Sequence, residues 1–398
     1  MRKDSRGGTD AAKAERWFAV GHARDANARR AGVEAAAQAL ERDDAKLLVV
    51  FCSDSYDLDE LLSGINERSG YVPLIGCSSA GEIATDGPGD AGVVVTAFGG
   101  DFSVATAAAV GASRRLREAG AEAASCVASV DDKPHRVLMM LTDGLAGDQQ
   151  QIVRGAYGVV GAGVRLVGGC AGDDLKMKAT FQLHGDRVLS DAVVTAAIAS
   201  DAPLGIGVRH GWRRTGAPML ITKSANNRVY TIENEPALDV YLTRLDASEE
   251  VRSDPAAFTR FAQTHQLGLK TRAGEERVRF IGEADFKNRS LGCIAEVPQG
   301  GLAWFMEGDD QSVLEATDSA CGDALALLEG RPALGVVAFD CIARRGILGN
   351  EGIQTEIRRI AENVNRAPVS GFYTYGEIAR TQGVSGFHNQ TLVVLAVA

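Results

Sequence analysis

The first segment whose residues could do chemistry is GCSSAGEI, at Gly76–Ile83, which follows an apolar run. Small residues at the end of a strand let backbone N–H groups turn outward and form a nest for an anion or a carbonyl group. We therefore predict that Ser78, Ser79 and Gly81 contact a ligand. The segment also matches the G-x-S-x-G nucleophile elbow, except that alanine replaces its last glycine. A nucleophilic Ser78 or Cys77 is thus one alternative, and a plain packed turn is another.

The second segment, GGCAGDD at Gly168–Asp174, has a similar design, with glycines and carboxylates after an apolar run. Gly172, Asp173 and Asp174 are predicted ligand contacts, because carboxylates can bind an ammonium group; they could equally cap the start of a helix. A third turn adds Asp143 to the predicted ligand site. A hard metal ion would need several further oxygen ligands that the sequence does not supply, so no metal site is predicted.

The C-terminal part contains a third group of polar residues. Arg344 and Arg345 could clamp a carboxylate, because a guanidinium presents a fork of donors. Glu377 is predicted in the same site, although it could instead form a structural ion pair with one of these arginines. Asn389 supplies both a donor and an acceptor. Cys341 follows an apolar run and is interpreted as a packed residue unless its pKa is lowered.

The histidines are the residues that could hold haem. There are 6 of them, scattered along the chain, and none belongs to a C-x-x-C-H attachment motif. His210 lies in an apolar run beside Trp212, and His184 lies in a predicted hairpin; these two are the preferred axial ligands if haem binds. The expected cofactor is none, with haem b as the alternative.

Composition narrows the class of protein. The chain has 398 residues, 45% of them hydrophobic, which is ordinary for a globular protein. With 42 basic and 52 acidic residues its net charge is −10, so it has no general attraction for nucleic acid or anionic lipid. No apolar run approaches the roughly 18 residues of a membrane span. The 7 cysteines show no C-x-x-C spacing, which favours a reduced cytoplasmic compartment.

Hydrophobic patterning predicts the elements that position these groups. Continuous apolar runs such as Lys46–Cys52 and Arg136–Leu141 are typical of buried strands, and they alternate with helical segments such as Asp148–Val160. Phe372–Ile378 is predicted as one strand. The predicted fold class is α/β (α+β), with two layered mixed-sheet domains and helices packed on the sheets. No short internal repeat is visible. The predicted divisions are a disordered tail at 1–14 and domains at 15–230 and 231–398.

Five segments in order resemble the FIST sensory family, in which a FIST N-terminal region precedes a FIST C-terminal domain. The resemblance extends over Arg16–Ala398, and it implies a FIST N-terminal α/β domain at 15–230 and a FIST C-terminal α+β domain at 231–398. The segments that carry it are GCSSAGEI (Gly76–Ile83), GGCAGDD (Gly168–Asp174), ENEPALDVYL (Glu233–Leu242), FDCIARR (Phe339–Arg345), and FYTYGEIA with FHNQTLVVL near the end.

The resemblance implies a signal-input module that senses a small ligand, with amino acids as one suggested class. It leads us to expect a bacterial, cytoplasmic, non-enzymatic, stand-alone sensor. No kinase, cyclase or methyl-accepting segment follows Ala398, so the expected output is a separate signalling protein such as a histidine kinase or a cyclase/phosphodiesterase. Some family members resemble haem-binding nitric oxide sensors, which is one alternative; a hydrolase or transferase with a Ser or Cys nucleophile is the other.

Overall fold

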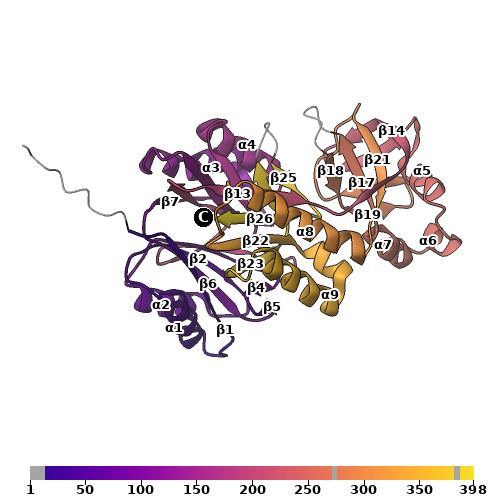
Figure 1. Ribbon diagram of the computed structural model, residues 1–398. Coiled ribbons are helices and arrows are strands. Elements are labelled where there is room, and N and C mark those ends of the chain that lie inside the picture. The colour runs from indigo at the N-terminus through magenta and orange to yellow at the C-terminus, as the bar shows by residue number, and fades with distance from the viewer. Residues whose placement is uncertain (1–13, 271–275, 381–385) are drawn as a thin grey trace, which may run out of the picture.

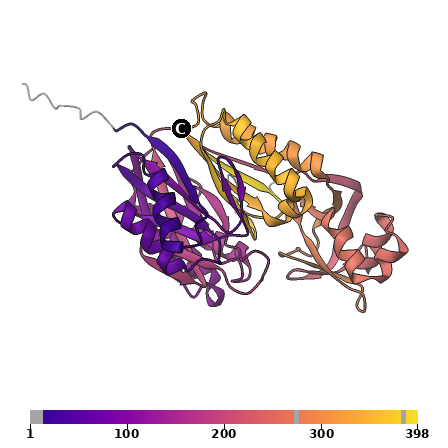
Figure 2. The same ribbon diagram turned by 90° about the horizontal axis from the view of Figure 1, so that it is seen from below.

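The structure is a computed structural model that describes residues 14–270, 276–380 and 386–398; the predicted tail at 1–14 lies outside these residues except for Ala14. Figures 1 and 2 show mixed sheets with helices packed on them, which confirms the predicted α/β class. The described chain forms a body of three sheets with paired helices. A smaller unit, which we call the outer domain (residues 213–307), stands to one side of the body in both views.

The three sheets of the body share one strand order. In each, two antiparallel strands precede a parallel pair, and an antiparallel hairpin closes the row. The first sheet is β1 (Trp17–Ala23), β6 (Val93–Gly99), β2 (Ala45–Cys52), β3 (Leu74–Ser78), β10 (Phe181–His184) and β11 (Arg187–Ser190). The second is β7 (Phe102–Val110), β12 (Ala192–Ser200), β8 (His135–Thr142), β9 (Arg165–Cys170), β24 (Glu377–Arg380) and β25 (Phe387–His388). The third is β13 (Leu204–Arg209), β26 (Leu392–Val397), β22 (Gly335–Cys341), β23 (Val369–Thr374), β4 (Glu82–Ala84) and β5 (Gly87–Gly89).

This shared order is a threefold internal repeat, whereas the sequence showed no short repeat. The closing hairpin of each sheet comes from another repeat: β10 joins β3, β24 joins β9, and β4 joins β23. The sheets therefore combine segments from both sides of residue 230. The predicted strand Phe372–Ile378 is two strands in two sheets, because the chain leaves the third sheet after Thr374 and enters the second at Glu377. An apolar run alone does not reveal such a crossing.

A helix pair covers each sheet. The pairs are α1 (Ala28–Ala39) with α2 (Leu58–Ser69), α3 (Leu116–Ala124) with α4 (Gln149–Val160), and α8 (Asp310–Ala326) with α9 (Ile342–Asn363). Short 3₁₀ turns lie at Ala112–Arg114 and Ser125–Ser129. Local sequence sets their ends: α2 starts after Asp57, whose carboxylate accepts the N–H of Glu60, and stops at Gly70 in the left-handed conformation. α9 bends at Gly349, where the backbone is not helical.

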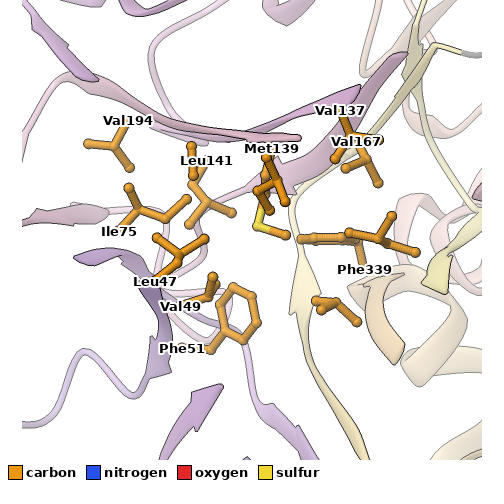
Figure 3. Close-up of a cluster of buried hydrophobic side chains, with 14 of the residues drawn as sticks. Leu47, Val49, Phe51, Ile75, Val137, Met139, Leu141, Val167, Val194 and Phe339 are labelled. Carbon is orange, nitrogen blue, oxygen red and sulfur yellow. The ribbon is translucent and has the colours of Figure 1, made fainter. Parts of the chain in front are cut away.

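The inner faces of the three sheets form one core. Figure 3 shows Phe51 from the first sheet, Met139 from the second and Phe339 from the third converging on the same space. Each of these side chains is fully buried. Phe51 stacks on Phe372 with ring centroids 4.6 Å apart. Because this core needs apolar residues from all three repeats, burial of hydrocarbon holds the body together as one unit.

The outer domain has its own sheet and core. Tyr241, Phe258 and Phe305 pack there, and the Tyr241 hydroxyl donates to the His265 carbonyl (2.8 Å). It joins the body through residues 210–212 and 308–309. Its elements are β14 (Arg213–Ala225), β15 (Arg228–Ile232), β16 (Glu235–Pro236), α5 (Ala237–Arg244), α6 (Glu249–Ser253), α7 (Pro255–Gln263), β17 (His265–Lys270), β18 (Glu276–Arg279), β19 (Ile281–Asp285), β20 (Ser290–Cys293) and β21 (Leu302–Glu307).

Candidate functional site

The two glycine-rich segments predicted to bind a ligand do meet, together with a third. They are the crossing loops, defined as Ser78–Glu82, Cys170–Asp173 and Tyr373–Glu377, and each carries the chain from its own sheet toward the next. Backbone hydrogen bonds join all three in a closed ring. These bonds run from the Gly172 N–H to the Ser78 carbonyl (3.0 Å), from the Cys170 N–H to the Gly376 carbonyl (2.8 Å), and from the Tyr373 N–H to the Gly81 carbonyl (2.8 Å).

The glycines of the ring permit this close approach. A Cβ on Gly172 would lie 3.0 Å from the Ala80 nitrogen. Gly81 has a φ of +115°, which a side chain disfavours, and a Cβ there would lie 2.1 Å from Nη1 of Arg345. In this structure the groups that approach these glycines are parts of the chain itself, and the predicted contact with a ligand stays a prediction.

Ser78 and Cys77 do not have the surroundings of a nucleophile, which corrects the nucleophile-elbow alternative. Ser78 is fully buried; its hydroxyl donates to the Gly172 carbonyl (2.8 Å) and accepts from the Phe181 N–H (2.9 Å). Cys77 is also fully buried, and burial raises the pKa of its thiol well above the usual range. A nucleophile needs an activating base and access to substrate, whereas the Ser78 hydroxyl and the Cys77 thiol are both buried in the core.

Two buried glutamates close the first and third crossing loops in the same way. Ser79 donates to Glu82 (2.6 Å), and Thr374 donates to Glu377 (2.6 Å). The other oxygen of Glu377 accepts the N–H of Thr391 (3.1 Å). Burial raises the pKa of each glutamate to about 7. Both carboxyl groups thus sit near their titration point at neutral pH, held by hydroxyl and amide donors.

The predicted aspartates divide into two buried groups and one exposed group. Asp143 accepts from the Thr180 hydroxyl (2.8 Å) and from backbone N–H groups. Asp173 accepts from three backbone N–H groups and from the hydroxyl of Tyr375. Although its burial alone would raise the pKa of Asp173, the hydrogen bond from Tyr375 and those from the backbone lower it. Asp174 is exposed, with a φ of +54°. The two buried carboxylates are therefore engaged within the chain.

The two predicted arginines have separate structural partners. Arg344 is fully buried and forms ion pairs with Asp340 (2.7 Å) and with Glu356. Its pKa is raised because the two carboxylates outweigh the opposite effect of burial. Arg345 donates to the Ala80 carbonyl (2.8 Å). It also pairs with an exposed aspartate and lies over the ring of Tyr373.

The two preferred haem ligands do not fit that cofactor. Nδ1 of His210 accepts the Trp212 N–H (2.9 Å), so Nε2 carries the proton and faces the Glu276 carboxylate at 4.0 Å. Burial lowers the pKa of His210 to about 4. Nε2 of His184 lies 3.1 Å from the Thr106 hydroxyl. Neither residue lines the large cavity described next. An axial ligand needs a free ring nitrogen that faces an open space.

A cavity of about 670 Å³ lies between the body and the outer domain. Its body side includes the start of α9, at Ile342, Ala343 and Gly346, together with Tyr375 and Asn389. The outer domain contributes Gln263, Phe280, Glu283, Cys293 and Ile294, and a loop after the second crossing loop adds Leu175 and Met177. The wall is largely apolar, and its volume lies within the roughly 300–1,000 Å³ of small-molecule sites.

Asn389 is the predicted site residue that lines this cavity. It is 2% exposed, and its Oδ1 receives no hydrogen bond from any described residue. Buried polar groups normally have a partner, so this atom requires an explanation. A half-turn of the amide exchanges its oxygen and nitrogen, which lets the group serve as acceptor or donor. Tyr375, which lines the same cavity, is held by two hydrogen bonds, one given to Asp173 and one received from the Leu175 N–H (2.6 Å).

Sequence reasoning missed the apolar wall. Leu175 and Met177 are each 62% exposed, and both have a positive φ. The sequence feature that could have identified them is that two apolar residues follow the GGCAGDD segment in an otherwise polar loop. Phe280 and Ile294 come from the outer domain, more than a hundred residues later, so only the fold could place them opposite.

The described residues contain neither a cluster of metal-ligating side chains nor a membrane-spanning helix. No group of three or more His, Cys, Asp or Glu is arranged there to hold a metal ion. None of the described helices is both long and apolar enough to cross a membrane.

Comparison with known proteins identifies two family regions. A model described as FIST N domain matches residues 46–235, and one described as FIST C domain matches residues 237–380. Uncharacterized protein MJ1623 of Methanocaldococcus jannaschii is 22% identical over 220 residues, which are 52% of this chain and 42% of that protein. The chain thus spans less than half the length of this relative. The resemblance expected from the motifs is confirmed.

Proposed function

The chain belongs to the FIST family, whose domains are of a sensory type, and from this premise we propose that the body and the outer domain hold a small ligand between them. The observation that carries the proposal is the cavity of about 670 Å³ between these two units. Ligand sites concentrate at such boundaries, in largely apolar spaces with a few polar groups. Asn389 is such a group, since none of the described residues hydrogen-bonds to its Oδ1.

The same geometry connects binding to a signal. A ligand in the cavity touches α9 and the crossing-loop region on one side and β20 on the other. The two units are joined by two short linkers, at residues 210–212 and 308–309. A ligand that contacts both units favours the arrangement in which they are close, because it binds that state more tightly. The changed surface would then be read by a separate signalling protein, such as a histidine kinase or a cyclase/phosphodiesterase.

The proposed role is binding without catalysis, in the cytoplasm, and amino acids are the first ligand class to test. The two thiols in the cavity wall fit this view. Cys341 and Cys293 are buried, and burial raises the pKa of Cys341 well above the usual range and that of Cys293 to about 12. Thiols in this state are poor nucleophiles.

Thermal unfolding in the presence of each amino acid tests the proposal. A ligand that binds only the folded state adds about 2.7 kcal/mol of stability at a hundredfold excess over its Kd. The blocking variant is Gly346→Leu, because Gly346 lines the cavity and a Cβ there meets no atom within 4 Å. Gly322→Leu on α8 is the matched control, since its Cβ is equally unobstructed and lies outside this cavity.

The expected result is an amino acid that raises the melting temperature of the wild type and of Gly322→Leu but not of Gly346→Leu. A stabilisation that survives Gly346→Leu would place the ligand elsewhere and refute the site. No stabilisation by any amino acid would remove that class and leave the cavity to the broader probes described below.

A further inference from the structure

A second cavity continues the first. It has a volume of about 490 Å³ and shares Gly144, Gly147, Asn227, Ile294 and Tyr375 with the cavity of about 670 Å³. Its remaining wall is mostly polar. It is formed by the start of α4 on the body and by the segment that follows β20 on the outer domain. The two spaces together form a groove with an apolar compartment and a polar compartment.

Arg154 of α4 is the cationic side chain in the wall of the polar compartment. It is partly buried and, within the described part of the chain, has no ion pair or side-chain hydrogen bond. Its polar neighbours are already engaged. Asp148 caps α4 by accepting the Gln150 N–H (3.0 Å), and its other oxygen accepts from the Gln151 amide (3.2 Å).

Gln149 is committed as well, because it accepts from the Thr142 hydroxyl (2.8 Å) and donates to the Asp143 carbonyl (2.7 Å). Arg154 is therefore the cationic group of this wall that is left to meet a ligand.

The cations around this compartment allow an anion to bind there. Arg279 of β18 is buried behind it, and its Nε donates to the carbonyl of Glu296, a wall residue (3.0 Å). The guanidinium groups of Arg154 and Arg279 thus offset the carboxylates of Asp148 and Glu296, in a protein whose net charge is −10. Because Asp148 is already hydrogen-bonded within α4, Arg154 remains the cation with which an anionic ligand can pair.

We infer that the ligand is an amphipathic anion, with its apolar body in the larger cavity and an oxyanion, a carboxylate or a phosphate, at Arg154. This inference rests on the proposed function, since it assumes that the larger cavity is the ligand site. A guanidinium binds either oxyanion with two parallel hydrogen bonds, so the head group could be of either kind. Glu296, on the opposite wall, repels an anion, so removing its charge should strengthen the binding of an anionic ligand.

Two fluorescent probes separate the two compartments. 1-Anilinonaphthalene-8-sulfonate carries an anionic head, and N-phenyl-1-naphthylamine has the same aromatic skeleton without it. Arg154→Gln should weaken binding of the sulfonate about tenfold or more and leave the neutral probe unchanged, because it removes a charge-assisted hydrogen bond. Glu296→Gln should strengthen binding of the sulfonate alone. Arg117→Gln, on the exposed side of α3, is the matched control and should change neither.

Each outcome is decisive. Equal sulfonate affinity in the wild type and in Arg154→Gln overturns the inference, and leaves the proposed function standing if Gly346→Leu still expels both probes. Binding of both probes that is insensitive to Gly346→Leu, or no binding of either, overturns the proposed function and the inference with it. Displacement of the sulfonate by decanoate, decyl phosphate or decanol then identifies the head group; decanol competing as well as both anions would contradict the assignment.

Discussion

Replacing Arg344 by methionine should destabilise the body without removing a ligand contact. The side chain is fully buried, and its Nε donates to Asp340 (2.7 Å). Nη2 donates to Thr317 (2.9 Å) and to Glu356. Methionine fills similar space but leaves two carboxylates buried without a counter-charge. Breaking a buried ion pair in this way costs about 3–5 kcal/mol. Against a typical total of roughly 5–15 kcal/mol, this is a large fraction of the stability.

The triple variant Asp340→Asn, Glu356→Gln, Arg344→Met is the informative partner of this experiment. It removes all three charges together, so no ion is left uncompensated, and replacing a complete buried triad is often close to neutral. Urea unfolding followed by circular dichroism should therefore show a loss of about 3–5 kcal/mol for the single variant. Much of that loss should be recovered in the triple variant.

Two outcomes would refute this reasoning. A loss below about 1 kcal/mol for Arg344→Met would mean that the two carboxylates do not depend on the guanidinium. A normal unfolding curve combined with lost probe binding would instead support the sequence-based prediction that Arg344 clamps a ligand.

Two further changes test the crossing loops and the repeat. Burial raises the pKa of Glu377 from 4.5 to about 7, so the folded state retains a proton that the unfolded state releases; stability should fall by about 3 kcal/mol as the pH rises through this window. In thermal melts at several pH values, Glu377→Gln should remove this pH-dependent loss of stability. The exposed control Glu351→Gln should keep it. An unchanged dependence of melting temperature on pH in Glu377→Gln would contradict the assignment. Gly168→Ala should prevent folding, because its Cβ would lie 1.9 Å from the Met140 carbonyl oxygen at a φ of +150°. Gly158 lies within α4, where an added Cβ is unobstructed, so the control Gly158→Ala should stabilise the protein by about 0.5–1 kcal/mol. Equal melting temperatures for the two alanine variants would be inconsistent with the close contact between Gly168 and Met140.

The predicted elements were most accurate where the pattern was local. The strand predicted at Lys46–Cys52 is observed at Ala45–Cys52, and the helix predicted at Asp148–Val160 is observed at Gln149–Val160, with Asp148 as its N-cap. These elements depend on their own residues: a continuous apolar run, and a capping carboxylate before a helical segment. The pattern also predicts a helix at Gly352–Val364, which is only the second part of α9, because Gly346 and Gly349 weaken the helical pattern near its start.

The glycine-rich segments show where local reasoning ended. It marked Gly76–Gly81 and Gly168–Gly172 as places where the backbone can approach a ligand, and the structure brings these two segments together. The approaching group is another crossing loop of the same chain. Ligand contact by the predicted residues stays a prediction, and Asn389 is the one that lines the large cavity. A glycine indicates that another group approaches the backbone closely, but which group this is depends on segments far away in the sequence.

The sequence by itself determined the α/β class, the family and the buried strands, because these follow from composition, hydrophobic period and motif order. Only the tertiary structure decided the threefold repeat and the cavity. The repeat is a pattern of strand pairing in which β4, β10 and β24 each enter another repeat's sheet. The cavity joins walls from distant parts of the chain, with Leu175 and Met177 more than a hundred residues before Phe280 and Ile294, so neither wall can be recognised as a binding surface from its own sequence.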